Sequence, residues 1–458
     1  MRVVICGAGQ VGYGIAERLA AEENDVTIID TSPRLIGAVR DSLDVRGIVG
    51  NGAHPDVLAQ AGAEEADMII AVTLADEVNM VACQVAHSLF NVPTKVARIR
   101  AQSYLQAHWR DLFSRTHMPI DVIISPEIEV GEMVMRRLAI PSALDIVRFA
   151  EDSVVVLGLR CGEDCPVVDT PLHQLSELFP DLGAVIVGIN RQGSVFAPKT
   201  SDSMLVGDIV YVVMAKDQVR RLLKIFGQDE PEAKRIIIAG GGNIGAFVAG
   251  AIEKRNPFAK VKVIESSPER AMAIADDLHE TIVLQGSALD KTLLAEADVD
   301  QADTMVAVTN DDEVNILSCV MARTLGAKRT LSLLNNSSYP EFAKALGIDA
   351  YINPRGVTVS KVLRHVRRGR IRGVHSVQNG AAEIIEAEAL DTSPMVGKPL
   401  RQIDLPSGVR IGAIYRKGQT ISPTGETRIQ ARDRVILFAV ANRVRAVEQM
   451  FRVSLEFF

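Results

Sequence analysis

Residues 2–12 read RVVICGAGQVG, and residues 235–245 read RIIIAGGGNIG. In each stretch an apolar, β-branched run leads into glycines spaced as GxGxxG. This pattern predicts a buried strand, a tight turn and a helix that opens a nucleotide-binding Rossmann-type fold. The paired glycines are separated by the same 233 positions (240 − 7): Gly7 and Gly240, Gly9 and Gly242, Gly12 and Gly245.

The similarity between the halves continues beyond the glycines. VTIIDTSPR at 26–34 matches VKVIESSPER at 261–270, and AVTLADEVN before residue 80 matches AVTNDDEVN before residue 316. A repeat of this length indicates a duplicated unit rather than a chance motif. Later in each half, short β-branched runs alternate with turns at Arg-x-Gly, which predicts a small β-rich domain after each nucleotide fold.

The expected fold class is therefore α/β, with two tandem parallel-sheet domains, each followed by a small α+β domain. A polar segment, GQDEPEAK, separates the halves, and helices starting at Ser125-Pro126 and Asn353-Pro354 connect the domains within each half. The predicted boundaries are 1–121 for the first nucleotide domain, 122–142 for its connector helix, 143–226 for the first small domain, 227–234 for the linker, 235–353 for the second nucleotide domain, 354–372 for its connector and 373–453 for the second small domain.

Composition narrows the function classes. The chain has 458 residues, 47% of them hydrophobic but only 4% aromatic, which suits parallel strands buried under helices. A net charge of -7 argues against a nucleic-acid binder. The five cysteines are scattered, which predicts buried thiols in a reducing compartment rather than disulfides or a metal site. No run approaches the roughly 20 apolar residues that span a bilayer, and no secretory leader is present, so a cytoplasmic protein is expected.

Each position of the first glycine motif has its own physical reason. Gly7 permits the turn out of the strand, Gly9 leaves room for a pyrophosphate, and Gly12 lets the helix approach the sheet. The helix N-terminus offers unpaired N–H groups to phosphates. Asp30 ends the next strand, where it accepts hydrogen bonds from ribose hydroxyls and repels a 2′-phosphate, which favours NAD over NADP.

Further candidate ligand contacts surround these glycines in both halves. The loop and helix start add Ala8, Gln10 and Val11 in the first half and Asn243, Ile244 and Glu265 in the second. The adenine is expected near Asn51 and Gly52 in one half and near Ser287 in the other. Two alternatives stay open: Asn51 either reads an adenine edge or only caps a turn, and either site is a Rossmann-like fold without a ligand.

The ends of the next two strands carry more polar groups. Thr73 to Asp76 and Thr309 to Asp312 fit a helix capping box, beside which Thr73 and Thr309 are candidate binding residues. Arg98 and Arg100 end a β-branched run, where they either pair with phosphates or lie as a charged strand end in solvent. Ser332 and Leu334 are taken as their counterparts, which suggests that the two sites differ in ligand or affinity.

The chain lacks the groups that a dehydrogenase needs beside its cofactor. No His–Asp pair or Tyr-x-x-x-Lys is apparent, and no histidine recurs at an equivalent place in the other half. We therefore expect a sensor of nucleotides rather than an enzyme. A basic run stands out in this acidic chain, and it either meets an acidic partner or lipid surface or forms a solvated helix end: Lys361, Arg364, His365, Arg367, Arg368, Arg370 and Arg372.

Taken together, these motifs resemble a known domain family. GAGQVG followed by VTIID, the AVTLADEVN segment, the Pro-started connector and the GKPL…ISPTGET…DRVILF tail are similar to the RCK (also called KTN) domain with its C-terminal companion. Two such units in one chain resemble the peripheral regulatory subunits of Trk-type potassium-uptake systems. The resemblance covers nearly the whole chain, and the duplication and tail make it specific.

The resemblance implies properties that the residues alone do not establish. Such subunits form homo-oligomeric rings, expected here as a tetramer, on the cytoplasmic side of an integral-membrane potassium-transporter subunit. They bind NAD(H) and adenine nucleotides (ATP and ADP) as regulatory ligands and transmit nucleotide state to the gate. The family often has an Arg in the glycine loop for a terminal phosphate; Gln10 and Asn243 stand there in this chain, so Arg98 and Arg100 are the candidates to replace it. An NAD-dependent oxidoreductase and a free-standing nucleotide-binding scaffold are the alternatives.

Overall fold

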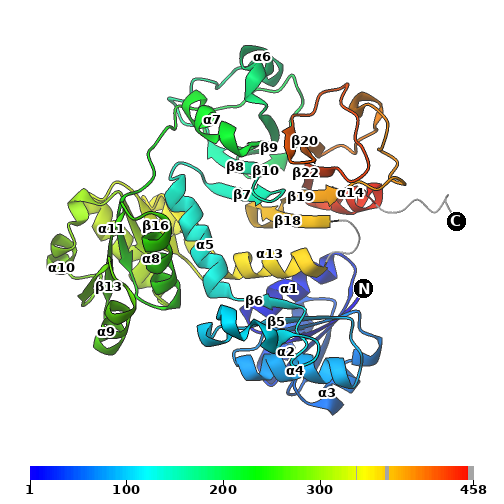
Figure 1. Ribbon diagram of the computed structural model, residues 1–458, viewed down its shortest axis with the longest axis vertical. Coiled ribbons are helices and arrows are strands. Elements are labelled where there is room, and N and C mark those ends of the chain that lie inside the picture. Colours follow the sequence, from blue (N-terminus) through cyan, green and yellow to red (C-terminus); the bar gives the residue numbers. More distant parts are fainter. Residues whose placement is uncertain (337, 367–370, 452–458) are drawn as a thin grey trace. The chain divides into compact units, whose positions relative to one another are not determined.

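The computed structural model describes residues 1–336, 338–366 and 371–451. The chain forms two compact units, each assembled from both halves of the sequence. Unit 1 comprises Met1–Glu132 and Arg235–Val366, and unit 2 comprises Met133–Lys234 and Arg367–Phe458. Figure 1 shows the elements of both units in sequence colours.

The first half of unit 1 is a six-stranded, wholly parallel sheet in the order β3-β2-β1-β4-β5-β6. Its strands are β1 (Arg2–Cys6), β2 (Asp25–Asp30), β3 (Arg46–Val49), β4 (Met68–Ala71), β5 (Thr94–Arg98) and β6 (Val122–Ile124). Its helices are α1 (Gln10–Ala21), α2 (Pro33–Ser42), α3 (Pro55–Gln60), α4 (Asp76–Ser88) and α5 (Pro126–Ala139). The strand order reverses between β1 and β4, where open α/β sheets bind their ligands.

The second half repeats this arrangement, in the order β14-β13-β12-β15-β16-β17. Its strands are β12 (Arg235–Ala239), β13 (Lys260–Glu265), β14 (Ile282–Gln285), β15 (Thr304–Ala307), β16 (Thr330–Leu333) and β17 (Ala350–Ile352). Its helices are α8 (Asn243–Arg255), α9 (Pro268–Asp277), α10 (Lys291–Glu296), α11 (Asp312–Thr324), α12 (Tyr339–Ala345) and α13 (Pro354–Val366).

Unit 2 holds two five-stranded antiparallel sheets, in the orders β10-β9-β11-β8-β7 and β18-β19-β22-β20-β21. The first contains β7 (Asp145–Phe149), β8 (Val154–Arg160), β9 (Val185–Arg191), β10 (Ser194–Phe196) and β11 (Ile209–Ala215), with α6 (Leu172–Leu178) and α7 (Val219–Ile225). The second contains β18 (Ile371–Val377), β19 (Ala382–Glu388), β20 (Val409–Arg416), β21 (Gln419–Ile421) and β22 (Arg434–Val440), with α14 (Val444–Met450). The predicted fold class, two parallel-sheet domains each with a small β-rich companion, is confirmed.

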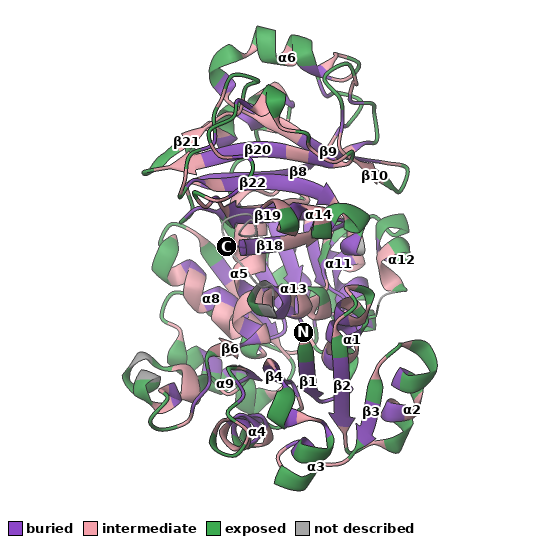
Figure 2. Cartoon of the chain, turned by 90° about the vertical axis from the view of Figure 1, so that its right-hand side faces the viewer, coloured by how far each residue is buried: buried purple, intermediate pink, exposed green. Residues whose placement is uncertain are grey.

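Buried residues concentrate on the strands, whereas the outer helices α2, α3 and α6 show mostly exposed residues (Figure 2). The cysteines follow this division, because all five are buried and unpaired. Burial raises the pKa of the Cys6 thiol to about 12. The prediction of buried free thiols is therefore confirmed.

The two halves exchange helices inside unit 1. Helix α13 of the second half places Val362 and Leu363 in the apolar core that covers one face of the first sheet. In return, a Cβ on Gly131 of α5 would lie 2.2 Å from the ring of Phe247 on α8, which shows how closely α5 approaches the second half. Helix α13 thus packs on the first sheet, and α5 packs against helix α8 of the second half.

Ion pairs fix these exchanged helices. Arg255 on α8 and Glu132 on α5 lie 2.6 Å apart, and Lys361 on α13 and Glu129 on α5 lie 2.7 Å apart. Arg355 at the start of α13 lies over the ring of Tyr13 on α1. Such partly exposed pairs stabilise modestly, but they fix the helix register.

The small domains of unit 2 also share a core. Apolar side chains from both sheets form one cluster, in which Tyr211 and Phe438 stack with ring centroids 6.4 Å apart. His375 on β18 lies 3.2 Å from Asp145 on β7, a His–Asp pair that was not apparent in the sequence because 230 positions (375 − 145) separate its members. Sequence spacing gives no signal for such a pair.

The connectors and the basic run are partly as expected. Both connector helices begin at the predicted prolines, Pro126 and Pro354, and the Asn353 side chain accepts a hydrogen bond from the N–H of Gly356. Strand β6 extends the first sheet beyond the predicted boundary at residue 121. In the basic run, Lys361 and Arg372 form ion pairs, with Glu129 and Glu388. Arg367, Arg368, Arg370 and the side chain of Arg364 lie outside the described residues.

Candidate functional site

The glycine loop after β1 is shaped by three different steric conditions. Gly7 has φ +110°, and a Cβ there would lie 3.0 Å from the backbone of Val72 and Thr73, so the turn needs glycine. A Cβ on Gly12 would lie 1.8 Å from the carbonyl oxygen of Gly7. A Cβ on Gly9, in contrast, would meet nothing within 4 Å. Because Gly9 has no side chain, the space in front of the loop stays open.

That open space lies at the start of a helix. Gly9 is the N-cap of α1 in an extended conformation (φ −66°, ψ −175°), and no side chain caps the helix. The first N–H groups, at Gln10 and Val11, are left for another acceptor, and the helix dipole adds partial positive charge. The loop is thus suited to an anion such as a pyrophosphate.

The acidic residue expected at the end of β2 lies beside this loop. The Asp30 carboxylate accepts hydrogen bonds from the N–H groups of Ala8 (2.7 Å) and Ser32 (2.8 Å). In the second half Glu265 accepts from Gly241 (2.7 Å) and Ser267 (2.8 Å). Both acids therefore hold the turn after their strand to the glycine loop, where a ribose would approach.

The second glycine loop repeats the geometry of the first. Gly240 has φ +100°, a Cβ on Gly245 would lie 1.9 Å from the Gly240 carbonyl oxygen, and Gly242 has open space. It differs in one respect: the Arg270 guanidinium donates to the Gly241 carbonyl (3.0 Å) and to the Asn243 side chain (2.7 Å). Asn243 is followed by Ile244 in the first turn of α8. A cation therefore lies against this loop.

The residues expected near the adenine make local turns. Asn51 accepts a hydrogen bond from the N–H of Ala53 (3.0 Å), and Ser287 accepts one from Leu289 (3.2 Å). A Cβ on Gly52 would lie 2.7 Å from the Cys6 sulfur, so Gly52 packs directly against β1. In this structure the side chains of Asn51 and Ser287 stabilise the loop after the third strand of each sheet.

The prediction that Thr73 and Thr309 begin helix capping boxes is wrong. The N-cap residues of α4 and α11 are Ala75 and Asp311. Asp76 instead accepts hydrogen bonds from the backbone of Arg100 and Ala101, and Asp312 from Asn335 and Asn336. These two buried carboxylates join the helix that follows one strand to the loop that follows the next.

A buried asparagine, not predicted from the sequence, positions each threonine. The Asn79 side chain accepts from the N–H (2.8 Å) and hydroxyl (2.7 Å) of Thr73 and donates to the carbonyl of Arg98 (2.9 Å). Asn315 does the same for Thr309 and Leu333. The signal for this role was present in the repeated DEVN motif, whose last residue is this asparagine.

These hydrogen bonds also correct the match between the halves. Because Asn79 bonds the carbonyl of Arg98 and Asn315 bonds that of Leu333, Leu333 is the counterpart of Arg98. The loops bound by Asp76 and Asp312 pair Arg100 with Asn335 in the same way. The expected counterparts, Ser332 and Leu334, were each one residue out of register.

The two arginines have different surroundings. Arg98 is 8% exposed, and its Nε and Nη2 have no hydrogen-bond partner among the residues that the structure describes. Burial, together with the charge of Arg100, lowers the pKa of the Arg98 guanidinium. Arg100 is half-exposed and donates to the Glu127 carboxylate (2.8 Å) at the start of α5. Two cations therefore lie at the end of β5, and one of them is paired with a carboxylate of α5.

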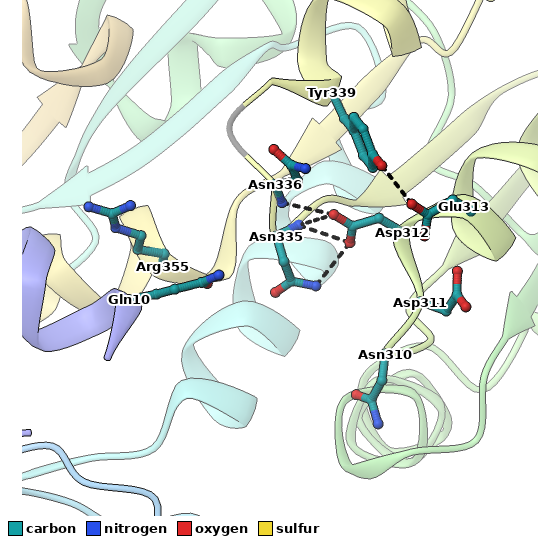
Figure 3. Close-up of a pocket in the computed structure, with 9 residues that line it drawn as sticks. All are labelled: Gln10, Asn310, Asp311, Asp312, Glu313, Asn335, Asn336, Tyr339 and Arg355. Carbon is teal, nitrogen blue, oxygen red and sulfur yellow. Dashed lines mark hydrogen bonds between the residues drawn. The ribbon is translucent and has the colours of Figure 1, made fainter. Parts of the chain in front are cut away.

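The corresponding place in the second half is a cavity. It has a volume of about 720 Å³ and lies at the carboxyl ends of β15 and β16. Tyr339 donates to the Glu313 carboxylate (2.6 Å) on its wall, as Figure 3 shows. Its lining is polar: Gln10, Asn310, Asp311, Asp312, Glu313, Asn335, Asn336, Tyr339 and Arg355.

The described residues include no group of three or more His, Cys, Asp or Glu side chains that could hold a metal ion. No helix in the described ranges is long and apolar enough to cross a membrane. The arrangement offers hydrogen-bond donors for phosphates and acids for ribose hydroxyls.

Comparison with known proteins identifies the same units. The TrkA-N domain model matches residues 3–126 and 236–354, and the TrkA-C domain model matches residues 152–227 and 384–452. The chain is 65% identical to the Trk system potassium uptake protein TrkA of Azorhizobium caulinodans and 40% identical to that of Halomonas elongata, with 100% of both chains covered in each case.

Solved structures share the fold. The RCK domain of GsuK aligns with a TM-score of 0.61 at 19% identity, covering 98% of this chain and 94% of that one. The GsuK channel bound to NAD aligns with a TM-score of 0.61 at 19% identity, covering 98% and 78%. At this identity the likeness concerns architecture, and it extends over both halves of the chain.

Proposed function

We propose, from the premise that this chain belongs to the TrkA family of potassium-uptake proteins, that it binds NAD(H) or adenine nucleotides and couples nucleotide state to the gate of a membrane pore subunit. The observation that carries the proposal is the uncapped start of α1 behind Gly9, with Asp30 at its side. The same features recur at Gly242 and Glu265. A site built twice suits a sensor that reads ligand occupancy.

The proposed role places the chain in the cytoplasm, as a homo-oligomeric ring, with a tetramer as the expected state, against an integral-membrane potassium-transporter subunit. The family membership supports a potassium-transport partner. Solved RCK structures of the same fold include a channel bound to NAD and a GsuK structure bound to ADP, which supports both ligand classes. In the first half, Arg98 and Arg100 supply the positive charge that a terminal phosphate needs.

Coupling requires that ligand binding favours one shape of the ring over another. Moving a gate from mostly closed to mostly open takes a differential affinity of about 10⁴, or 5.5 kcal/mol, which several linked sites can share. Helix α5 contains the division between the two units, at Glu132 and Met133. We place the hinge in the connectors, around residues 122–142 and 353–373.

The test is potassium flux through the pore subunit in proteoliposomes, with and without this chain and each nucleotide. The proposal is supported if the potassium flux changes with the nucleotide only when this chain is present. It is contradicted if the flux is the same with and without nucleotide. A parallel assay follows NADH absorbance with small carbonyl substrates. Sustained NADH turnover would instead support the alternative of a duplicated oxidoreductase.

A further inference from the structure

The two nucleotide sites differ most where the second pair of strands ends. In a fold with this strand order, a dinucleotide lies across the crevice, with its adenosine over the first three strands and its other nucleoside over the last three. In the second half that position is the cavity at the carboxyl ends of β15 and β16. The distal group of a dinucleotide bound at Gly242 would therefore enter this cavity.

The second half has exchanged cations for neutral and acidic groups at this position. Leu333 and Asn335 stand where the first half has Arg98 and Arg100, and Asp311 stands where it has Ala75. The exchange removes two positive charges and adds one negative charge. Glu313 has a counterpart in Glu77, and Arg355 stands where the first half has Glu127. A terminal phosphate would therefore meet Asp311 here, without the two guanidinium groups that the end of β5 offers in the first half.

The carboxylates around the cavity are held in place. Asp311 caps α11 by accepting from the N–H of Val314 (2.9 Å), and Glu313 accepts from the Tyr339 hydroxyl (2.6 Å). Both side chains belong to exposed residues that line the cavity (Figure 3). Asp312 lies behind them, bonded to the N–H groups of Asn335 and Asn336.

The positive charges near the cavity have other contacts. Arg355 lines the cavity, but its guanidinium lies 3.7 Å from the Glu17 carboxylate and over the Tyr13 ring on α1. Arg270 is bonded to the glycine loop, at Gly241 and Asn243. The second site thus has a cation where a pyrophosphate would lie and acids where the distal group would lie.

This charge distribution matches one form of a dinucleotide. NAD⁺ carries its negative charges on the pyrophosphate and a positive charge on the nicotinamide ring, whereas the ring of NADH is neutral. We propose that the second half binds NAD⁺ in preference to NADH and to nucleoside triphosphates, with the cationic ring beside Asp311 and Glu313. This inference rests on the proposed function, because it refines the ligand of the same duplicated site.

The test is calorimetric titration of the full chain carrying Gly9→Ala, which weakens binding at the first site, with NAD⁺, NADH and ATP. NAD⁺ should bind at least about tenfold more tightly than NADH, and ATP should bind most weakly. Because exposed charges are screened by salt, the NAD⁺ preference should fall as ionic strength rises from 0.01 M to 0.5 M. Circular dichroism of the same samples checks that the chain is folded.

Two sets of variants connect the preference to the cavity. Asp311→Asn with Glu313→Gln keeps both hydrogen-bond acceptors while removing two charges, and should reduce the NAD⁺ preference to less than about threefold. Asp276→Asn with Asp277→Asn removes the same number of charges from exposed positions on α9, and should leave it unchanged. Asn335→Arg should strengthen ATP binding severalfold.

The outcomes separate the two levels of the argument. If the unmodified chain binds none of the nucleotides, the proposed function fails. If the unmodified chain binds them but the Gly9→Ala chain does not, the proposed function stands and the inference for the second half is overturned. Equal affinity of the Gly9→Ala chain for NAD⁺ and NADH, or tighter binding of ATP, would also overturn it.

Discussion

Two alanine substitutions in the first glycine loop, at Gly9 and Gly12, should affect different properties: nucleotide binding in one case and stability in the other. A Cβ at Gly9 meets no atom within 4 Å, whereas a Cβ at Gly12 would lie 1.8 Å from the Gly7 carbonyl oxygen and 2.9 Å from its carbon. Gly9→Ala should leave stability nearly unchanged and weaken nucleotide binding. Gly12→Ala should destabilise the first half before any ligand is added.

The magnitudes follow from these contacts. At Gly9, losing glycine as N-cap costs up to about 1 kcal/mol, while the stiffer unfolded chain returns about 0.4–1 kcal/mol. At Gly12, the backbone must move by more than 1 Å to reach an ordinary carbon–oxygen separation of about 3.3 Å, and overpacking of this kind costs about 3 kcal/mol or more. The corresponding falls in melting temperature are about 3 °C or less for Gly9→Ala and at least about 6 °C for Gly12→Ala.

The binding effect of Gly9→Ala is estimated from the phosphate contacts. Its methyl group would keep a pyrophosphate from the first N–H groups of α1. Losing one hydrogen bond to a charged group costs about 1.5–3 kcal/mol, which raises Kd about 10- to 150-fold. Calorimetric titration with NAD⁺ measures this change, and Gly242→Ala is the matched variant in the second half.

A single result would refute this reasoning. If the folded Gly9→Ala protein binds NAD⁺ with unchanged affinity and stoichiometry, the pyrophosphate does not cross the loop at Gly9. A Gly12→Ala protein as stable as the unmodified chain would show that the loop can relax in a way that the close contact does not suggest.

Three further predictions concern the groups beside the sites and in unit 2. Asn79→Ala and Asn315→Ala should each lower the free energy of unfolding of their own half by about 2–4 kcal/mol, because a buried carbonyl and N–H lose their partner; thermal unfolding with and without nucleotide would show it, and an unchanged melting curve would contradict it. In the native protein the thiols should resist alkylation at pH 8, because all five cysteines are buried and burial raises the pKa of Cys6 to about 12; mass spectrometry before and after unfolding counts the labels, and rapid native labelling would refute the reasoning. Although burial opposes ionisation of Asp145, the nearby His375 holds the pKa of this carboxyl below 3.8. The ionised carboxyl therefore stabilises unit 2 above that pH, and this stabilisation is lost as the pH falls through the lowered pKa. The melting temperatures of the unmodified chain and Asp145→Asn should converge below pH 3.8, and a constant difference would argue against this role.

Much of the architecture was predictable from local patterns. The glycine spacing after an apolar strand located both Rossmann sheets, and Asp30 was correctly expected at the end of β2 because this position follows from the strand–helix–strand spacing. The Pro-started helices were also predictable, since proline at the first helical position is a local signal. The duplication then extended each prediction to the second half.

What could not be predicted depends on contacts between distant residues. Asp76 looked like the end of a capping box, but its partners lie on the loop after β5, 24 positions away at Arg100. The expected counterparts of Arg98 and Arg100 were one residue out of register, because the separation between equivalent residues changes along the chain, from 236 (315 − 79) at Asn79 and Asn315 to 235 (333 − 98) at Arg98 and Leu333. The burial of Arg98, whose Nε and Nη2 have no hydrogen-bond partner among the described residues, could not be predicted either, since the exposure of a strand end depends on the helices packed over it.

The exchange of α5 and α13 has a consequence for the history of the chain. Two identical subunits that traded these helices would form a symmetric dimer, in which every substitution appears in both sites at once. Joining the copies in one polypeptide ends that constraint, while the helix exchange keeps the halves dependent on each other for folding. Arg100 and Asn335 can then occupy equivalent positions in one molecule. A substitution in one half can therefore change the ligand preference of that half while the other half keeps its own.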